Sequence, residues 1–282
     1  MSSIEKAINR QGKVSLDSSN SQENQQEPCI EARSSETEAN DASEFVHRLD
    51  LEAFAKGGFL VPSEERSSIA EEYRQIKRPL LMNAFGKGAV PIERGNMVMI
   101  TSSLPGEGKT FTSFNLAMSM AMEMDKTVLL IDSDVVKPSL TSLLGLTGKR
   151  GLIDILLDTK VDLQDIIITT DIPRLKVIPA GRSHHHSTEL LASEQMNILA
   201  KELSERYPDR MVVFDAPPLL VASETSVIAH QVGQVLMVVE AANTPQTTVK
   251  EALSKLDQDD VIGMILNKSR QKSQRDYYGG YY

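Results

Sequence analysis

The chain has 282 residues, of which 40% are hydrophobic, and a formal net charge of −9 from 30 Lys and Arg against 39 Asp and Glu. This length suits one α/β domain with extra segments or two small domains, and the hydrophobic fraction is enough for a sizeable core. The acidic balance argues against a general nucleic-acid binder, and the single cysteine, Cys29, excludes an intrachain disulfide and favours a reducing compartment.

Residues 1–44 are expected to be mostly disordered. The terminus MSSIEKAINR lacks the apolar core of a secretory signal, and residues 3–13 would form either a short amphipathic helix or a frayed end. Residues 15–44 contain eight acidic residues, one Arg and no aromatic residue, so they cannot bury enough apolar area to offset the entropy lost on ordering. No stretch of the chain approaches the ~18 apolar residues of a membrane span.

Apolar residues return in the segment 45–62, FVHRLDLEAFAKGGFLVP, which predicts an arm docked on the core. A helix is expected over 67–85, because Ser68 stands three residues before Glu71 in the pattern of a capping box. Pro79 is expected to interrupt this helix, since proline lacks the N–H group and clashes with the preceding turn.

From residue 97 onward, apolar runs alternate with helical stretches. The apolar runs predict buried parallel strands at 97–101, 127–131, 175–178, 211–214, 235–239 and 261–266. The main helices are expected at 109–124, 187–206 and 245–257. Repeated strand–helix units predict an α/β fold with a doubly wound, mostly parallel sheet and helices on both faces. Residues 268–282 have no apolar periodicity and are expected to be a flexible tail.

A P-loop motif connects the first strand to the first of these helices. The sequence SSLPGEGKT, residues 102–110, follows an apolar strand and opens a helix, which is the context that the motif requires. Lys109 would bridge the β- and γ-phosphates of a nucleotide, and Thr110 would ligate Mg²⁺. Ser103 replaces the usual first glycine, which a negative φ would allow. The residues expected to bind the nucleotide here are Pro105, Gly106, Glu107, Gly108, Lys109, Thr110 and Phe111.

Three aspartates stand at the carboxyl ends of apolar strands. Asp132 and Asp134 follow one strand in TVLLIDSD, and Asp215 ends another in MVVFDAPP. Such strand ends lie beside the P-loop, so the first two would hold Mg²⁺ or accept a proton, and Asp215 would stand behind the metal's water shell. Each aspartate alone would as readily cap a helix, but three beside a phosphate site favour a catalytic role.

The P-loop, VLLIDSD and VVFDAPP together resemble the bacterial tyrosine kinases, P-loop enzymes unrelated to the eukaryotic protein kinases. The resemblance covers about residues 67–282 and includes STELLAS and GMILNK. It implies a protein-tyrosine autokinase that uses ATP and Mg²⁺ and phosphorylates its own C-terminal tyrosines.

The resemblance also implies roles for single residues. Asp132 would be the base that accepts the tyrosine proton, with Asp134 supporting the metal or the base, and Asn267 matches a position that reads the adenine edge. Lys137 stands where the family commonly has Arg. The implied catalytic residues are Lys109, Asp132, Asp134 and Asp215, and the implied metal ligands are Thr110, Asp132 and Asp215.

The last residues, RDYYGGYY, carry four of the six tyrosines in the chain. The resemblance makes them autophosphorylation sites: Tyr277, Tyr278, Tyr281 and Tyr282. The ten residues from Asn267 to Tyr277 extend at most ~35 Å, so we expect phosphorylation in trans within an oligomer.

The sequence EEYRQIK resembles an E-x-x-R-x-x-R motif that packs against a neighbouring subunit in ring-shaped oligomers. The corresponding residues here are Glu71, Arg74 and Lys77, and lysine lacks the bidentate fork of arginine. The resemblance therefore implies a ring-like homo-oligomer with these three residues at its contacts.

The sequence SIEKA and the arm look closest to the tyrosine autokinases of exosortase-linked exopolysaccharide loci. There the kinase is a separate chain, activated by a membrane polysaccharide co-polymerase or chain-length determinant. This implies a cytoplasmic protein recruited peripherally to the inner membrane, with a cognate tyrosine phosphatase and no nucleic-acid partner. The expected organisation is a disordered segment at 1–44, an arm and oligomerisation helix at 45–95, a P-loop kinase domain at 96–267 and a tyrosine-rich tail at 268–282.

Two other functions stay open on the sequence alone. A P-loop ATPase switch of the partitioning or cell-division positioning type shares the fold, but it carries a signature Lys five residues before the P-loop Lys, where this chain has Leu104. A nucleotide-dependent assembly scaffold would not need the four tyrosines. The run His184–His186 suits a solvated loop better than a metal site, because consecutive loop residues rarely converge on one ion.

Overall fold

The computed structural model describes residues 46–64, 67–86, 91–207, 209–257 and 261–269, which all belong to one compact unit of the chain, Ser43–Tyr282. The predicted disordered segment 1–44 and the tyrosine cluster lie outside the described residues. Within those residues, no helix has the length and apolar composition needed to cross a membrane.

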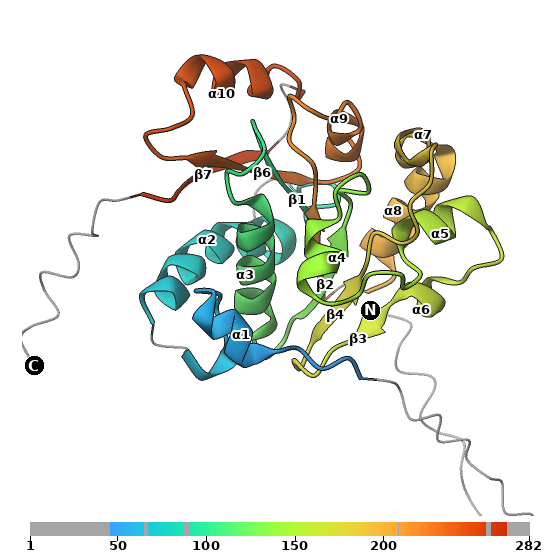
Figure 1. Cartoon of the computed structure of the whole chain (residues 1–282), viewed down its shortest axis with the longest axis horizontal. Coiled ribbons are helices and arrows are strands. Elements are labelled where there is room, and N and C mark those ends of the chain that lie inside the picture. The colour runs from blue at the N-terminus through green and yellow to red at the C-terminus, as the bar shows by residue number, and fades with distance from the viewer. Residues whose placement is uncertain (1–45, 65–66, 87–90, 208, 258–260, 270–282) are drawn as a thin grey trace, which may run out of the picture. The chain divides into compact units, whose positions relative to one another are not determined.

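A seven-stranded sheet with the order β3-β4-β2-β5-β1-β6-β7 lies at the centre of this unit (Figure 1). Its strands are β1 Met97–Ser102, β2 Thr127–Asp132, β3 Ile168–Thr169, β4 Leu175–Ile178, β5 Arg210–Asp215, β6 Gln234–Glu240 and β7 Ile262–Asn267. Neighbouring described strands pair in parallel except β3 and β4, which are antiparallel. The six predicted strands are confirmed, and β3 was missed because two residues give no apolar run.

Helices cover both faces of the sheet, and alternate strand residues point to opposite faces. Met97 and Met99 of β1 belong to one buried cluster, whereas Val98 and Ile100 belong to the other. The first cluster includes α5 Leu152–Leu157, α6 Leu163–Ile166, α7 Ser187–Leu191, α8 Glu194–Glu205, α9 Glu224–Ala229 and α10 Gln246–Leu253. The second includes α1 Leu51–Lys56, α2 Ser68–Phe85, α3 Lys109–Ala121 and α4 Ser139–Leu143. The doubly wound architecture is therefore confirmed.

The arm packs against α3, the helix that follows the P-loop. Its residues Phe54 and Leu60 are buried, and a short 3-10 helix, Pro62–Glu64, follows them. The ring of Phe59 lies 4.8 Å from the ring of Phe111, measured between centroids, and the Leu60 N–H donates to Asn115 Oδ1 at 2.7 Å. A segment some fifty residues before the P-loop thus supports the helix on which the P-loop ends.

Two expectations about α2 are wrong. The N-cap is Ser67, whose hydroxyl accepts from the Ala70 N–H at 3.2 Å, and Ser68 is already the first helical residue. The helix also continues through Pro79 to Phe85. One face of α2, which includes Tyr73, is buried against α3, and this tertiary packing outweighs the local cost of the proline.

The helix expected over 187–206 is in fact two helices. α7 ends at Leu191 and α8 begins at Glu194, with Ser193 in an extended conformation between them. The Ser193 hydroxyl donates to the Leu190 carbonyl at 2.6 Å, a local bond that competes with the continuing helix. The short helices α4, α5, α6 and α9 were not predicted, because one or two turns show too little periodicity.

Candidate active site

The P-loop forms a strand, loop and helix in the predicted order, with α3 beginning at Lys109. Gly106 and Gly108 have φ values of 88° and 100°, in the left-handed region that favours glycine. A Cβ at Gly108 would also collide with the side-chain nitrogen of Asn267. Ser103 does not have a positive φ, so it replaces the usual first glycine of the motif without backbone strain.

The side chain of Glu107 holds the P-loop in place from within. It is buried, and its Oε2 accepts from the Leu104 N–H at 2.7 Å. Its Oε1 accepts from the Glu240 N–H at 3.2 Å and from the Thr244 hydroxyl. Glu107 therefore ties the loop to the end of β6, and the loop is preformed for phosphate.

The end of β7 also contacts the P-loop. The Asn267 amide donates to the Glu107 carbonyl at 2.8 Å, and Lys268 Nζ donates to the Gly106 carbonyl at 2.7 Å. The Asn267 Oδ1 accepts from the Lys268 N–H at 2.9 Å, so both ends of this amide are engaged. A cavity of about 740 Å³ adjoins this strand end, lined by Glu240, Ala241, Ala242, Asn243, Leu266, Lys268 and Ser269.

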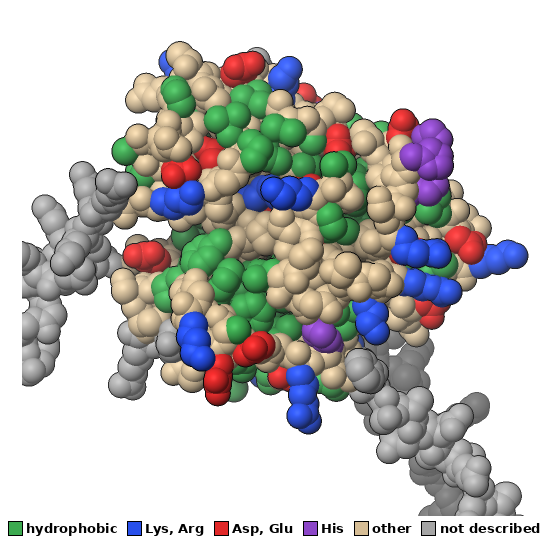
Figure 2. Space-filling model, viewed as in Figure 1, with side chains coloured by type: hydrophobic (Ala, Val, Ile, Leu, Met, Phe, Trp, Pro, Cys, Tyr) green, Lys and Arg blue, Asp and Glu red, His purple; other side chains and the backbone are tan. Residues whose placement is uncertain are grey.

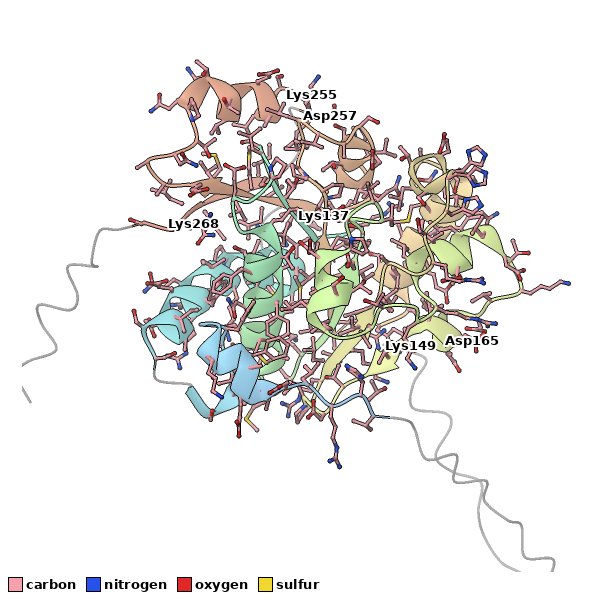
Figure 3. The ribbon with its side chains drawn as sticks, in the orientation of Figure 1. Lys137, Lys149, Asp165, Lys255, Asp257 and Lys268 are labelled. Carbon is pink, nitrogen blue, oxygen red and sulfur yellow. The ribbon has the colours of Figure 1, made fainter. Side chains whose placement is uncertain are left out.

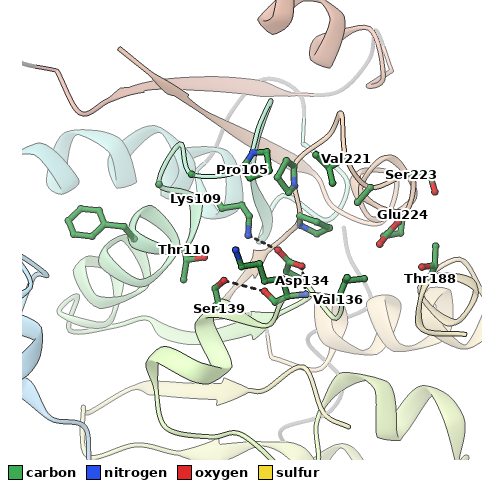
Figure 4. Close-up of a pocket in the computed structure, with 17 residues that line it drawn as sticks. Pro105, Lys109, Thr110, Asp134, Val136, Ser139, Thr188, Val221, Ser223 and Glu224 are labelled. Atoms are coloured by element: carbon green, nitrogen blue, oxygen red, sulfur yellow. Dashed lines mark hydrogen bonds and ion pairs between the residues drawn. The ribbon is translucent and has the colours of Figure 1, made fainter. Parts of the chain in front are cut away.

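A second cavity, of about 720 Å³, opens on the other side of the P-loop (Figure 4). In the view of Figure 3, Lys268 at the end of β7 and Lys137 near the start of α4 lie on opposite sides of the start of α3. Figure 2, in the same orientation, shows a Lys or Arg side chain beside hydrophobic side chains near the middle of the face toward the viewer. The predicted site residues that line this cavity are Pro105, Gly106, Gly108, Lys109, Thr110, Phe111 and Asp134.

A buried ion pair stands at the inner end of this cavity. Lys109 Nζ lies 2.8 Å from Asp134 Oδ2. Burial opposes the charge of Lys109, but the charges of Asp215 and Asp134 outweigh burial and raise the pKa of this lysine. A fully charged Lys109 is what the phosphates of a nucleotide require, and they would compete with Asp134 for it.

Asp132 lies beneath Asp134 and is fully buried. Its Oδ2 accepts from both the N–H and the hydroxyl of Thr141 at 2.7 Å, and its Oδ1 accepts from the Asp134 N–H at 3.2 Å. Burial, and next the charge of Asp215, raise the pKa of Asp132 to about 7. The structure thus brings both carboxylates to the site but gives only Asp134 a position on the cavity wall.

Asp215 ends β5 directly opposite Asp132 in the sheet register. Its Oδ1 accepts from the Ser113 hydroxyl at 3.0 Å, and its Oδ2 is buried with no hydrogen-bond partner among the described residues. Burial raises the pKa of Asp215, and the charge of Lys109 opposes that effect. The hydroxyl of Thr110 lies close enough to Asp215 to oppose the rise of its pKa, and both groups offer hard oxygen atoms that fit Mg²⁺ and its water shell.

Mg²⁺ at this site would be held by protein oxygens together with phosphate and water. No group of three or more His, Cys, Asp or Glu side chains suited to a metal occurs in the described part of the chain. Mg²⁺ commonly binds through one or two protein oxygens together with substrate phosphates and water. Thr110 and Asp215 fit that mode. The third predicted ligand, Asp132, does not, because it is fully buried and both of its oxygens already accept hydrogen bonds.

The three residues of the EEYRQIK motif on α2 do not share one exposed face, which corrects the expectation that all of them lie at oligomer contacts. Glu71 and Arg74 are exposed and form an ion pair at 2.8 Å. Lys77 is only 7% exposed; its Nζ donates to the Ser119 carbonyl at 2.6 Å and pairs with Glu123 at 2.7 Å. Lys77 therefore joins α2 to α3 within one chain and does not lie on the exposed face with the other two.

Several residues that complete the site were not found from the sequence. Ser113 stands one helical turn after Lys109, a spacing that could have marked it as a neighbour of the strand-end carboxylates. Thr141 holds Asp132 from across a loop, and no local pattern indicated this contact. The far wall of the 720 Å³ cavity, which includes Val221 and Glu224, comes from the loop after β5 and the start of α9.

Comparisons with known proteins agree with this geometry. Residues 95–259 match the family model of the AAA domain. The tyrosine-protein kinase YwqD of Bacillus subtilis is 31% identical over 222 residues, which cover 77% of this chain and 89% of that protein. The kinase domain of VpsO superposes with a TM-score of 0.59 at 32% identity, and the match covers 72% of this chain and 100% of that domain.

Some relatives are much longer than this chain. The tyrosine-protein kinase Ptk of Acinetobacter johnsonii is 30% identical over 250 residues, which cover 83% of this chain but 33% of that protein. The chain thus spans about a third of the length of Ptk and nearly the whole of YwqD.

Proposed function

The chain belongs to the bacterial tyrosine-protein kinases, and from this membership we propose that it transfers the γ-phosphoryl group of ATP to the tyrosines of its own C-terminal segment. The arrangement that supports this activity most directly is the preformed P-loop with Lys109, Asp134, Asp132 and Asp215 gathered at one end of the sheet. Glu71 and Arg74 on the surface of α2 support assembly into an oligomer.

In the proposed reaction, the P-loop backbone and Lys109 would hold the phosphates, and Thr110 and Asp215 would hold Mg²⁺. Mg²⁺ would neutralise charge that develops on the phosphoryl oxygens. The tyrosine oxygen bonds to the γ-phosphorus while the bond from that phosphorus to the β–γ bridging oxygen breaks, and ADP leaves. Positioning and charge neutralisation contribute most in such a loose transition state.

The proton of the tyrosine would pass to the Asp132–Asp134 pair. A free phenol has a pKa of about 10, so attack near neutral pH benefits from a base. Asp134 has access to the cavity, and Asp132 has the pKa of about 7 that suits a base at neutral pH. Asn267, at the end of β7, would contact the adenine if its amide left the Glu107 carbonyl and donated to the base instead.

Phosphorylation is proposed to occur in trans, within a ring. The tyrosines begin ten residues after Asn267, a reach of at most ~35 Å, which favours entry into a neighbouring copy. We further propose that the cytoplasmic chain is recruited to the inner membrane by a polysaccharide co-polymerase and takes part in exopolysaccharide synthesis or export. A cognate tyrosine phosphatase would reverse the modification. The resemblance of SIEKA and the arm to the exosortase-linked autokinases supports this assignment.

The test is intact mass and peptide mapping after incubation with Mg·ATP, alone and with the cytoplasmic segment of the candidate co-polymerase. We expect phosphate on Tyr277, Tyr278, Tyr281 or Tyr282, and none in a Lys109→Met control. ATP hydrolysis without phosphate on any tyrosine, in both conditions, would instead support an ATPase switch. A variant with all four tyrosines changed to Phe tests the scaffold function, because a pure scaffold would be indifferent to it.

A further inference from the structure

The 720 Å³ cavity extends past the phosphate site to a wall that the proposed phosphate chemistry does not use. Val136, in the loop after β2, and Val221, in the loop after β5, flank it and are 75% and 64% exposed. Pro217 and Pro218 form part of the lining between them. In the view of Figure 4, Val136 lies next to Asp134, and Val221 lies above both. Apolar side chains exposed around one cavity indicate a ligand with an apolar surface.

The same wall contains a buried carboxylate that the chemistry leaves unused. Glu224, the first residue of α9, is only 5% exposed and lines the cavity. Its carboxylate makes no hydrogen bond or ion pair with any residue in the described ranges. Figure 4 places Glu224 on the side of the cavity away from Lys109. Its oxygens are not sealed from the cavity, so a cation or an N–H donor of a bound ligand could pair with this carboxylate.

A nucleotide base does not account for this wall. Asn267 and Lys268 contact the P-loop from its other side, beside the separate cavity at the ends of β6 and β7. The base would therefore lie on that side, and the phosphates would occupy the P-loop between the two cavities. The wall formed by Val136, Val221 and Glu224 is then left for the molecule that receives the phosphoryl group.

We propose that this wall recognises the acceptor segment, residues 275–282 of a second copy, with a tyrosine ring between Val136 and Val221 and the guanidinium of Arg275 on Glu224. The inference rests on the proposed kinase function. The segment has the matching chemistry, because Arg275 precedes the first tyrosine by two residues. In extended chain that separation is about 7 Å, so Tyr277 is the acceptor that this pairing selects.

The valines are tested by the steady-state kinetics of the full-length enzyme, with a Lys109→Met copy of the full chain as acceptor. Val136→Ser and Val221→Ser should each raise the KM for the acceptor roughly tenfold, the usual effect of lost methyl contacts in an apolar subsite, with a much smaller change in the KM for Mg·ATP. Ile198→Ser is the matched control, because Ile198 is 53% exposed on α8, outside this cavity lining. The proposal would be overturned if Val136→Ser and Val221→Ser had the same acceptor KM as the Ile198→Ser control.

The ion pair is tested from the acceptor side, where the enzyme stays unchanged. Arg275→Gln in the Lys109→Met acceptor should raise its KM roughly tenfold and remove the preference for Tyr277 in peptide mapping. Glu224→Gln in the enzyme should raise the KM for the unchanged acceptor similarly, and combining both changes should add nothing further. Fully additive effects, or an Arg275→Gln acceptor that behaves as the unchanged one, would contradict the pairing.

Measurements on the unchanged enzyme distinguish a failure of this inference from a failure of the proposed function. If the unchanged enzyme places no phosphate on any tyrosine, the kinase function itself fails. If it phosphorylates the acceptor and the KM is insensitive to Val136, Val221 and Arg275, only the acceptor wall is wrong.

Discussion

Two aspartates separated by one residue, Asp132 and Asp134, have different environments at this site. Asp134 stands on the cavity wall and pairs with Lys109, whereas Asp132 is sealed beneath it by Thr141. The sequence pattern DSD predicted that both would reach the site, and the structure places both at this end of the sheet. The pattern could not distinguish them, because the distinction comes from a helix nine residues further on.

The pH dependence of kcat/KM tests this division, because that ratio reports the ionisation of the free enzyme. Asp132 must lose its proton to act as a base, and its pKa is raised to about 7. We therefore expect kcat/KM to rise as the pH increases through about 7. Asp132→Asn should lower the rate by roughly a hundredfold or more and remove this dependence. A dependence that persists in Asp132→Asn and disappears in Asp134→Asn would assign the base to Asp134.

The P-loop glycines offer a second residue-scale test with a matched pair. Gly106→Ala meets nothing within 4 Å, so it should cost only about 1–3 kcal/mol of unfolding free energy through its positive φ. Gly108→Ala has the same backbone penalty and also collides with the Asn267 side chain. We expect a larger loss of stability and of Mg·ADP affinity for Gly108→Ala, measured by urea unfolding and calorimetry. Equal losses of stability and affinity in the two variants would show that the Asn267 side chain moves away at little cost.

At the scale of elements, the long β-strands were predictable and the short helices were not. The predicted strands other than β7 are buried on both faces or nearly so, and their sequences are therefore continuous apolar runs. β7 is an edge strand with alternate residues exposed, yet its apolar composition still identified it. The course of α2 through Pro79 followed from packing against α3, which no local pattern contains.

The contact between α2 and α3 gives a prediction that separates folding from assembly. Lys77→Ala should lower the unfolding free energy by about 2–3 kcal/mol, because it removes a buried, charged hydrogen bond to Ser119. Arg74→Ala should change stability by less than about 0.5 kcal/mol, since its ion pair with Glu71 is exposed. Thermal unfolding measures the stability of both variants, and sedimentation velocity measures their assembly.

The Arg74→Ala variant is expected to assemble less than the unchanged chain, whereas Lys77→Ala should assemble in proportion to its folded fraction. If Lys77→Ala left stability unchanged but abolished assembly, the lysine would face a neighbouring copy in the oligomer. The buried position of Lys77 in the monomer argues against that outcome.

At the scale of the whole molecule, the residues at strand ends could be placed beside the P-loop from the sequence, whereas the loop residues that line the 720 Å³ cavity could not. Lys109, Thr110, Asp132, Asp134 and Asp215 follow strands whose carboxyl ends must meet in a parallel sheet, so their positions could be inferred without coordinates. Val136, Val221 and Glu224 lie in loops and on a short helix, whose paths depend on packing. The part of the site that would choose the acceptor was therefore not visible in the sequence.

The last prediction concerns how phosphorylation affects the assembly. Four phosphotyrosines would add roughly −6 to −8 charge per copy to a chain whose net charge is already −9. Acceptor segments crowded together in a ring would then repel one another and loosen it. In sedimentation velocity, the phosphorylated protein should contain more small species than the same protein treated with a phosphatase. The variant with all four tyrosines changed to Phe, incubated with Mg·ATP, is the control and should stay assembled.

Salt dependence distinguishes this repulsion from a change of conformation. The Debye length falls from about 10 Å at 0.1 M to about 3 Å at 1 M ionic strength, so added salt should restore assembly of the phosphorylated protein. Contacts that Glu71 and Arg74 make with a neighbouring copy would also weaken in salt, and the unphosphorylated protein measured at the same ionic strength corrects for that effect. Identical sedimentation profiles with and without phosphate at low salt would mean that the tyrosines do not control the ring through their charge.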